Sequence, residues 1–427
     1  MAADDATRPE PGPSLRQLTI FDAVARAGSV GAAARLMALS QPAVTHAMAQ
    51  LERTLGCRLL DRGQGGSSLT GAGAILHRRA TRLRAQLARG IAAARSELAE
   101  DAAALPRAAA VTRDKIIQDR ITQAQVASHV AVTERGSFRA AARALGISEP
   151  ALQRTARQLE QLIGVPLYAR AATTLTVTPA GRTLATALQL ALAEVASARD
   201  ELAALSGQAD GRVAIGCLPL MPKGLLARAI GQLLARFPSV AVSLEESSYD
   251  ELSAALRQGR LDMLVGALRA EGEGLEARML FDDPYVAVAR RGHPLLSRRR
   301  PPGPAELGRL GWVVPPRNTP RRGALESFFN SLPRRPPVVL ETNSVAMMIA
   351  TLVESDCLTL CSVAQARIDF VAVELALIPV AELSTPRPVG VTTRSDWLPT
   401  AVQRALLEII EALSAEVHAR KLDAPLA

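Results

Sequence analysis

The sequence predicts a protein of several domains, with two similar helix-rich modules followed by an α/β domain. Three observations lead to this prediction. A segment of the N-terminal half recurs 108 residues later, positive charge is concentrated in that half, and strands alternate with helices after Arg212. A length of 427 residues leaves room for roughly three domains.

The repeat aligns without a gap. The first copy begins at Gly28 and reads GSVGAAARLMALSQPAVTHAMAQLERTLGCRLLDR, and the second begins at Gly136 and reads GSFRAAARALGISEPALQRTARQLEQLIGVPLYAR. Residues 17–73 and 125–181 share 21 identical positions of 57. Alanine-rich helices would match by chance only at alanine. Here the identities include Gly28/Gly136, Ser40/Ser148, Pro42/Pro150, Glu52/Glu160 and Gly73/Gly181, which indicates an internal duplication.

Each copy predicts the same succession of elements. Apolar residues at helical spacing indicate a first helix, and each Gly-Ser dipeptide begins a second. A third helix is expected to begin at Ser40 and at Ser148, because serine caps helix N-termini and proline is favoured in the first turn. Gly56 and Gly164 are expected to end it. Two short strands and a long Ala/Leu-rich helix complete each copy, and this order is typical of a winged helix-turn-helix, a DNA-binding module.

The charge distribution favours nucleic acid as the partner of the N-terminal half. Residues 1–206 carry 25 Lys/Arg and 17 Asp/Glu, a net charge of +8, whereas residues 207–427 carry 25 and 24, a net charge of +1. A basic half joined to a neutral half fits a nucleic-acid footprint confined to the first. A general preference for arginine is the alternative, but it would not spare the C-terminal half.

Several classes of protein and site are not expected. No apolar run approaches the roughly 18–20 residues of a membrane helix. The acidic, Pro-rich N-terminus MAADDATRPEPGPS lacks the layout of a signal peptide, so a cytoplasmic protein that does not contact the membrane is predicted. The four cysteines form no CxxC pair and the five histidines show no ligand spacing, so neither a metal nor a cofactor is expected.

An enzyme is not expected either. The sequence contains no GxGxxG after a strand, no P-loop, no GxSxG and no His/Asp/Ser grouping suited to nucleophilic catalysis. A second alternative is a small-molecule-binding protein whose helix-turn-helix copies serve protein–protein contacts. The charge of +8 in the first 206 residues weakens this alternative.

After Arg212 the pattern predicts an α/β domain with a largely parallel sheet. The candidate strands are Val213–Cys217, Val240–Glu245, Met263–Gly266, Tyr285–Ala289, Trp312–Val314, Val338–Glu341, Leu358–Cys361 and Val389–Thr392. The candidate helices are Lys223–Arg236, Tyr249–Gln258, Arg321–Phe329, Ser344–Glu354 and Pro399–Glu416.

Three segments resemble one family. SQPAVTHAMAQLERTLGCRLLDR with LTGAGAIL, and SEPALQRTARQLEQLIGVPLYAR with VTPAGRTL, resemble the DNA-binding signature of LysR-type transcriptional regulators. The stretch 211–268, with FPSVAVSLEE and LRQGRLDMLVG, resembles the start of that family's effector-binding domain. The resemblance implies winged helix-turn-helix modules, linker helices that dimerise, and a two-lobed, periplasmic-binding-protein-like domain that senses a small molecule.

The resulting domain plan is as follows. A disordered lead covers 1–14, a first winged helix-turn-helix covers 15–73 and its linker helix covers 74–100. A connector over 101–120 leads to a second winged helix-turn-helix over 121–181 with a linker helix over 182–206. The effector-binding domain covers 211–415. By resemblance the chain is expected to regulate transcription from promoter DNA as a homodimer or homotetramer.

The resemblance also implies which residues face DNA. In the third helix these are Gln41, Pro42, Thr45 and His46 of the first copy and Glu149, Pro150, Gln153 and Arg154 of the second. The caps Ser40 and Ser148, together with Arg62, Arg157 and Arg170, complete the candidate DNA-binding set. Capping and solvation of the helix are the alternative roles for these side chains.

The copies depart from the family pattern in different ways. The first keeps Gln41 but has His46 where arginine is common. The second keeps Arg154 but has Glu149 where glutamine is usual, and a carboxylate is repelled by phosphates although it can accept a hydrogen bond from cytosine. Either copy could read a different base, or one could be a spacer, and we favour the first as the sequence reader. Three arginines of the first linker helix, Arg78, Arg82 and Arg89, could contact phosphates, form a solvated face or pair with acidic residues across a dimer.

Effector residues are expected where strands end, because open α/β sheets bind ligands there. The loop after the first strand is apolar, and Lys223, Arg269 or Arg317 could supply positive charge for an anionic effector. The candidate effector-binding residues are Leu218, Pro219, Leu220, Arg269, Arg317, Asn343 and Ser344. The identity of the effector stays open.

Overall fold

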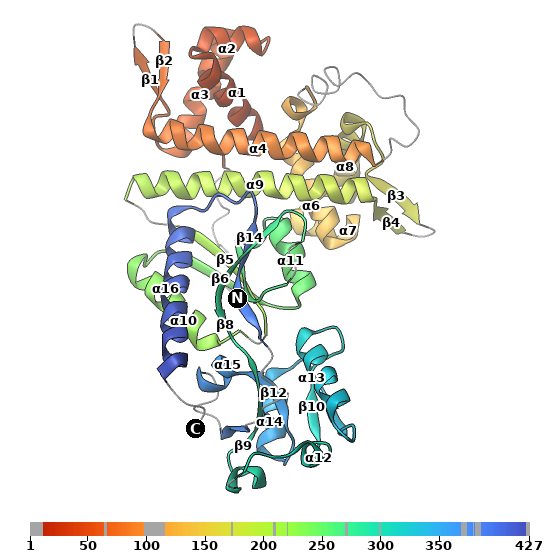
Figure 1. Ribbon diagram of the computed structural model, residues 1–427. Coiled ribbons are helices and arrows are strands. Elements are labelled where there is room, and N and C mark those ends of the chain that lie inside the picture. Colours follow the sequence, from red (N-terminus) through yellow and green to blue (C-terminus); the bar gives the residue numbers. More distant parts are fainter. Residues whose placement is uncertain are drawn as a thin grey trace, which may run out of the picture. The chain divides into compact units, whose positions relative to one another are not determined.

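The computed structural model describes residues 12–63, 66–97, 116–171, 174–207, 211–219, 221–269, 272–298, 300–368, 374–378, 380 and 386–423 (Figure 1). The chain divides into two units, Met1–Gly211 with Gln258–Arg260, and Arg212–Arg257 with Leu261–Ala427. The lead 1–11 and most of the predicted connector, 101–115, lie outside the described residues.

The first unit contains two modules with the same order of elements. The first comprises α1 (Leu15–Ala27), α2 (Val30–Leu36), α3 (Gln41–Leu55), β1 (Leu60–Gly63), β2 (Gly66–Leu69) and α4 (Gly71–Ser96). The second comprises α6 (Gln123–Arg135), α7 (Phe138–Leu145), α8 (Glu149–Ile163), β3 (Tyr168–Ala171), β4 (Thr174–Val177) and α9 (Pro179–Leu205). In each module the two strands pair antiparallel as a wing.

The residues shared by the two copies have matching structural roles. Ser40 and Ser148 cap α3 and α8, each accepting a hydrogen bond from a backbone N–H of the first turn. Gly28 and Gly136 end α1 and α6 with φ of 69° and 68°, in the left-handed region where glycine carries no steric penalty. These positions fix where the helices begin and end, so both copies fold alike.

The long helices α4 and α9 lie side by side and antiparallel, with the first wing at one end of the pair and the second wing at the other (Figure 1). Apolar residues of both modules form one continuous core, which includes Leu76, Leu87 and Ile91 of α4 and Leu184 and Leu188 of α9. The closest approach is at Gly90, where an added Cβ would lie 2.0 Å from Ala187 Cβ. The two modules therefore form a single structural unit.

The second unit has two lobes. The first lobe contains a five-stranded sheet in the order β6 (Ala241–Glu246), β5 (Arg212–Cys217), β7 (Met263–Ala267), β14 (Pro388–Arg394) and β8 (Leu275–Asp282). Its other elements are α10 (Lys223–Arg236), α11 (Tyr249–Arg257) and α16 (Ala401–Asp423), with α10 and α16 packed into one apolar core against β5 and β14.

The second lobe contains β9 (Tyr285–Arg290) between β12 (Thr359–Ser362) and β13 (Leu375–Ile378), and β10 (Trp312–Val314) paired with β11 (Val338–Glu341). Its helices are η1 (Pro294–Ser297), α12 (Pro304–Leu307), α13 (Pro320–Ser331), α14 (Val345–Val353) and α15 (Val363–Ile368). Trp312, Phe328 and Phe329 pack as an aromatic cluster with ring centroids 5.3–6.2 Å apart.

The prediction of a largely parallel sheet is wrong. β5 pairs parallel with β6 and β7, but β14 runs antiparallel to β7 and β8, and β9 runs antiparallel to β12 and β13. The chain leaves the first lobe after β8 and returns in β14, so the returning strand enters the first sheet in the opposite direction. The strands β8 and β13 are absent from the prediction, whereas the helix over Lys223–Arg236 is confirmed.

Within the described residues, no helix combines the length and apolar character needed to cross a membrane. Over the same residues, no group of three or more His, Cys, Asp or Glu side chains gathers as a metal site.

Candidate nucleic-acid interface and effector site

The first two turns of α3 expose one face to solvent, while the opposite face of the helix is buried. Gln41, Pro42 and His46 are exposed, whereas Val44, Met48 and Leu51 are at most 3% exposed and lie in the core. Backbone N–H groups at a helix N-terminus attract anions. The exposed turn therefore combines free polar side chains with a partial positive charge, as contact with a nucleic-acid backbone and base edges requires.

The exposed face of α8 lies opposite its buried face, as in α3, but has different chemistry. Pro150, Arg154 and Arg157 are exposed, and Leu152 and Ala156 are in the core. The carboxylate of Glu149 accepts a hydrogen bond from Gln153 Nε2 at 3.3 Å, and Arg139 Nε lies 3.9 Å from it. These contacts offset part of the repulsion that a lone carboxylate would exert on phosphates.

A glutamate fixes each wing against the preceding helix. Glu52 Oε1 accepts hydrogen bonds from the backbone N–H groups of Leu59 and Leu60 at 2.8 and 3.4 Å, and Glu160 does the same for Leu167 and Tyr168 at 2.7 and 3.3 Å. The start of each long helix is held equally tightly. A Cβ at Gly73 would lie 2.1 Å from Leu59 O, and one at Gly181 would lie 2.4 Å from Leu167 O. Helix and wing thus form one rigid surface in each module.

A network of buried charges joins the two long helices. Arg79 is 2% exposed; its Nη1 donates to Glu194 Oε2 at 2.9 Å and its Nη2 to Glu201 Oε1 at 2.9 Å. Arg82 Nε donates to Glu194 Oε1 at 2.8 Å, and Arg78 Nη2 lies 3.2 Å from Glu201. Burial lowers the pKa of Arg79, but the hydrogen bonds that it donates to Glu201 and Glu194 outweigh this and raise the pKa.

In the second unit, the chain passes between the two lobes twice. These two crossings lie at Asp283 and at Arg387. Asp283 N donates to Arg387 O at 2.8 Å, and Arg387 Nη1 donates to Asp283 Oδ2 at 3.1 Å. Asp283 Oδ1 also accepts from the backbone N–H of Ala364 at 2.8 Å. Both side chains are buried, so the ion pair fixes the two crossings to each other and to the start of α15.

Further arginines surround this crossing. Arg321 of α13 is buried, and its Nη1 donates to Leu360 O at 3.3 Å and contacts Met348 Sδ at 3.5 Å. No carboxylate of the described residues forms an ion pair with Arg321, and burial lowers its pKa. The Arg387 guanidinium lies 5.7 Å from the ring centroid of Tyr285.

The charges of three arginines influence the pKa of the Tyr285 hydroxyl. Burial raises the pKa of the Tyr285 hydroxyl, and the charges of Arg387, Arg321 and Arg269 oppose that rise. Arg269, which follows β7 in the first lobe, stacks over Tyr249 at 5.1 Å, and its buried Nε has no hydrogen-bond partner within the described part of the chain. Side chains from both lobes and from the crossing thus gather positive charge around Tyr285. We call Arg269, Arg321 and Arg387 the arginine cluster.

Comparison with known proteins identifies both parts of the chain. The model of the LysR substrate binding domain matches residues 206–414. The model of the bacterial regulatory helix-turn-helix protein of the lysR family matches twice, at 15–74 and at 124–182.

A regulator of similar extent exists in Pseudomonas putida. The chain is 31% identical to the HTH-type transcriptional regulator GalR of that organism over 407 residues, which cover 95% of this chain and 98% of GalR. The chain belongs to the LysR family of transcriptional regulators. It is therefore a DNA-binding regulator of transcription with an effector-binding domain, as the family resemblance in its sequence implies.

Other known proteins match a smaller part of the chain. PcaQ of Agrobacterium fabrum is 28% identical over 309 residues, 71% of this chain and 98% of PcaQ. The structure of a full-length OxyR variant from Pseudomonas aeruginosa matches with a TM-score of 0.52 and 18% identity, covering 69% of this chain and 95% of OxyR. These relatives match over nearly their whole length and leave a part of this chain unmatched, whereas the alignment with GalR runs through both helix-turn-helix modules.

The structure brings most of the predicted DNA-facing residues of this LysR-family chain to the first turns of α3 and α8. Thr45 and Gln153 are half-buried there, and the caps Ser40 and Ser148 are exposed. Arg62 lies in β1 and Arg170 in β3, but their side chains are outside the described residues. Arg78 and Arg82 pair with glutamates of α9 in the same chain, whereas the sequence suggested such pairs across a dimer.

The predicted effector residues are less well gathered. Leu218 is buried, Pro219 half-buried, and Leu220 lies outside the described residues. Arg317 and Asn343 are exposed, and Ser344 caps α14 by accepting from Met347 N at 3.2 Å. Of the predicted set, Arg269 belongs to the arginine cluster. Sequence reasoning missed Arg321 and Arg387, because an arginine early in a helix or before a strand resembles a surface residue.

Proposed function

We propose that this LysR-family regulator contacts promoter DNA through the first turns of both α3 and α8, and that a small anionic effector bound between the lobes modulates this contact. The observation that carries the DNA-binding part is the exposure of Gln41, His46 and Arg154 on helices whose other faces are buried. An electrophoretic shift with DNA from upstream of the chain's own gene tests it. Binding should weaken steeply with added salt, because phosphate contacts release counterions.

A test by substitution asks whether the first turn of α3 reads sequence. Gln41→Ala should cost about 1–3 kcal/mol of discrimination at one base pair, the usual worth of a bidentate contact. Glu149→Ala should not lower specificity, since the carboxylate of Glu149 is already engaged by Gln153 and Arg139. Fluorescence anisotropy with the bound duplex and single-base variants measures both.

Gln50→Ala is the matched control for this test. Gln50 is an exposed glutamine of the same helix, more than two turns from Gln41, so its loss should leave discrimination unchanged. Equal losses from Gln41→Ala and Glu149→Ala would show that the two modules read DNA in the same way, contrary to the proposal.

The proposed class of effector rests on the arginine cluster. Arg387 is paired with Asp283, whereas Arg321 is buried against a carbonyl oxygen and a sulfur. Burying a charge without a carboxylate is costly, and an anion that accepts hydrogen bonds from Arg321 and Arg269 would compensate for it. A carboxylate suits this role, because guanidinium–carboxylate hydrogen bonds are strong and directional.

Arg321→Met tests the effector site. Small mono- and dicarboxylates added to the full chain should raise the unfolding temperature of the second unit, and Arg321→Met should weaken this response by roughly 10- to 100-fold in concentration, as expected for a lost charged hydrogen bond of about 1.5–3 kcal/mol. Fluorescence of Trp312 and Trp397, the two tryptophans of the chain, reports on this unit.

Arg317→Met is the comparison variant, because Arg317 is an exposed arginine of the same lobe. It should leave the response unchanged. If Arg317→Met abolished the response and Arg321→Met did not, the anion would bind at the exposed loop and not at the arginine cluster.

A further inference from the structure

The contacts between α4 and α9 follow a local two-fold symmetry within one chain. Gln86 and Glu194 occupy equivalent places in the two copies, 108 residues apart, and Gln86 Nε2 donates to Glu194 Oε1 at 3.4 Å. On one side of this pair Arg79 contacts Glu201, and on the other side Thr183 Oγ1 donates to Glu97 Oε1 at 2.6 Å. Residues that come earlier in one helix thus contact residues that come later in the other. The axis therefore passes near Gln86 and Glu194, and it relates the two modules as it would relate two subunits of a dimer.

The charges on the two helices are complementary to each other and not to themselves. If two α9 helices paired in the register of α4 and α9, Glu194 of one helix would lie against Glu194 of the other. Ala187 would then stand where Arg79 stands in the observed pair. Two α4 helices would bury Arg79 against Gln86 and Ala93, which hold the positions of Glu194 and Glu201. Buried charges left without a partner destabilise a pairing strongly.

The packing favours the same choice. Gly90 admits Ala187 at the closest approach, and the residue of α9 equivalent to Gly90 is Ala198. If two α9 helices paired, Ala198 would take the place of Gly90 and lie against Ala187. Two methyl groups would then have to fit where the observed pair holds only that of Ala187. Shape and charge thus both specify α4 with α9.

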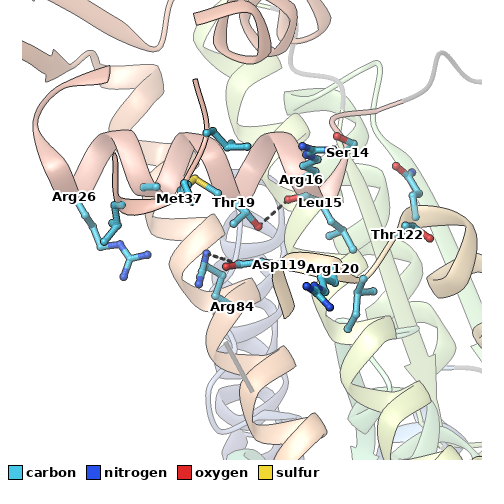
Figure 2. Close-up of a pocket in the computed structure, with 16 residues that line it drawn as sticks. Ser14, Leu15, Arg16, Thr19, Arg26, Met37, Arg84, Asp119, Arg120 and Thr122 are labelled. Carbon is cyan, nitrogen blue, oxygen red and sulfur yellow. Dashed lines mark hydrogen bonds and ion pairs between the residues drawn. The ribbon is translucent and has the colours of Figure 1, made fainter. Parts of the chain in front are cut away.

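The α4–α9 pair can also form readily within one chain. Glu97 contacts α9, and Asp119, only 22 residues later in the sequence, lies 3.6 Å from Arg84 of α4 (Figure 2). Ile117 and Ile121 are 4% exposed and belong to the shared core. The residues that make these contacts are close in sequence, and such a covalent connection favours the intramolecular pair at ordinary protein concentrations.

The modules also meet around a pocket of about 700 Å³. Figure 2 shows its lining: Ser14, Arg16 and Thr19 of the first module on one side, and Asp119, Arg120 and Thr122, which precede α6, on the other. The residues that lead into the second module therefore lie directly against the first. This second contact between the modules is independent of the α4–α9 pair.

We propose that one chain carries a complete two-headed DNA-binding unit and recognises a DNA site whose two halves differ in sequence. This inference rests on the proposed DNA-binding function. The paired helices separate the two modules by roughly 40 Å along their axis at 1.5 Å per residue, comparable with the roughly 35 Å of one turn of DNA. One head presents Gln41 and His46, whereas the other presents Arg154 and a glutamate, Glu149, whose carboxylate is engaged by Gln153 and Arg139. The DNA partner is thus a duplex whose two half-sites differ in sequence. One chain supplies both DNA-binding modules, so a second copy of this chain is not required.

A cross-link tests the intramolecular pairing. The double variant Glu97→Cys, Thr183→Cys is treated in the full chain with a short bifunctional maleimide; the two side chains contact each other, Glu97 being exposed and Thr183 half-buried. The expected product has the mass of one chain and contains a 97–183 linked peptide. A product of two chains joined through these positions would overturn the proposal. So would the absence of the link when both cysteines react with a monofunctional maleimide. The parent chain, with its native cysteines alone, is the control.

Footprints with single-head variants test the asymmetry on DNA from upstream of the chain's own gene. Gln41→Ala should reduce protection at least fivefold in one half of the site only, and Arg154→Ala in the other half only, with Gln50→Ala unchanged. Equal losses in both halves, or halves of the same sequence, would overturn the asymmetric site. Failure of the unsubstituted chain to bind any DNA specifically would count against the proposed DNA-binding function, while the cross-link would still decide the pairing.

Discussion

Replacing Arg79 by leucine should lower the free energy of unfolding of the first unit by about 3–5 kcal/mol, the usual effect of removing one partner from a buried ion network. Arg79 is 2% exposed and bonds to two glutamates of α9 that are themselves largely buried. Its loss leaves Glu201 and Glu194 with the more exposed Arg78 and Arg82. Hydrogen exchange of peptides from α4 and α9 in the full chain measures the change.

Two further variants separate charge from packing. Arg228→Leu removes an arginine from an exposed ion pair with Glu416, and its effect should be below about 1 kcal/mol. Replacing Arg79, Glu194 and Glu201 together by leucine should recover much of the loss, because apolar residues often replace buried ion pairs without net cost. A loss below about 1 kcal/mol from Arg79→Leu would show that the network does not hold the helices together.

The second module should lose roughly 3 kcal/mol of stability between pH 7 and pH 4, because its buried histidine is neutral in the folded state. His129 Nε2–H donates to Gly181 O at 2.8 Å, so Nδ1 accepts from the Tyr168 hydroxyl at 2.7 Å. Burial lowers the pKa of His129 from 6.5 to about 4, although the hydrogen bond to Gly181 raises it.

Stability falls on acidification because the unfolded state binds the proton at a higher pH than the folded state does. The histidine of the unfolded chain is protonated below about pH 6.5, whereas the folded one stays neutral down to about pH 4. The stabilisation is therefore complete above pH 6.5 and declines as the pH falls towards 4. Burial raises the pKa of the Tyr168 hydroxyl, and the nearby charge of Glu160 raises it further.

The first module supplies the control for this prediction. Phe21 and Leu60 stand at the positions of His129 and Tyr168, and Phe21 is fully buried. The double substitution His129→Phe, Tyr168→Leu should abolish the histidine-dependent part of the decline. Hydrogen exchange of α6 peptides at pH 7, 5.5 and 4 compares the two proteins, and identical pH profiles would contradict the assignment of His129.

The sequence was sufficient for the plan of each module because its strongest signals are local. Ser40, Gly56 and Gly73 and their counterparts mark helix ends and close approaches, and the structure gives each of them that role. The exposed first turn of α3 could also be predicted, since Val44, Met48 and Leu51 define its buried face.

What the sequence did not show depends on contacts between distant residues. Arg79 and Glu194 are far apart in the chain, so the family resemblance suggested linker helices that dimerise between subunits, whereas here α4 pairs with α9 of the same chain. The strand β8 escaped prediction because its hydrophobic residues are interrupted by charges at Glu276 and Arg278. Arg321 looked like a surface residue because only the fold buries it against Leu360.

Selection of binding sites from a pool of random duplex DNA by the full chain shows whether one chain reads two different half-sites. We expect a site with two halves of different sequence, separated by about one helical turn, of which Gln41→Ala changes one half and Arg154→Ala the other. A site that is a single inverted repeat of one sequence, altered in both halves by the same substitution, would contradict this expectation.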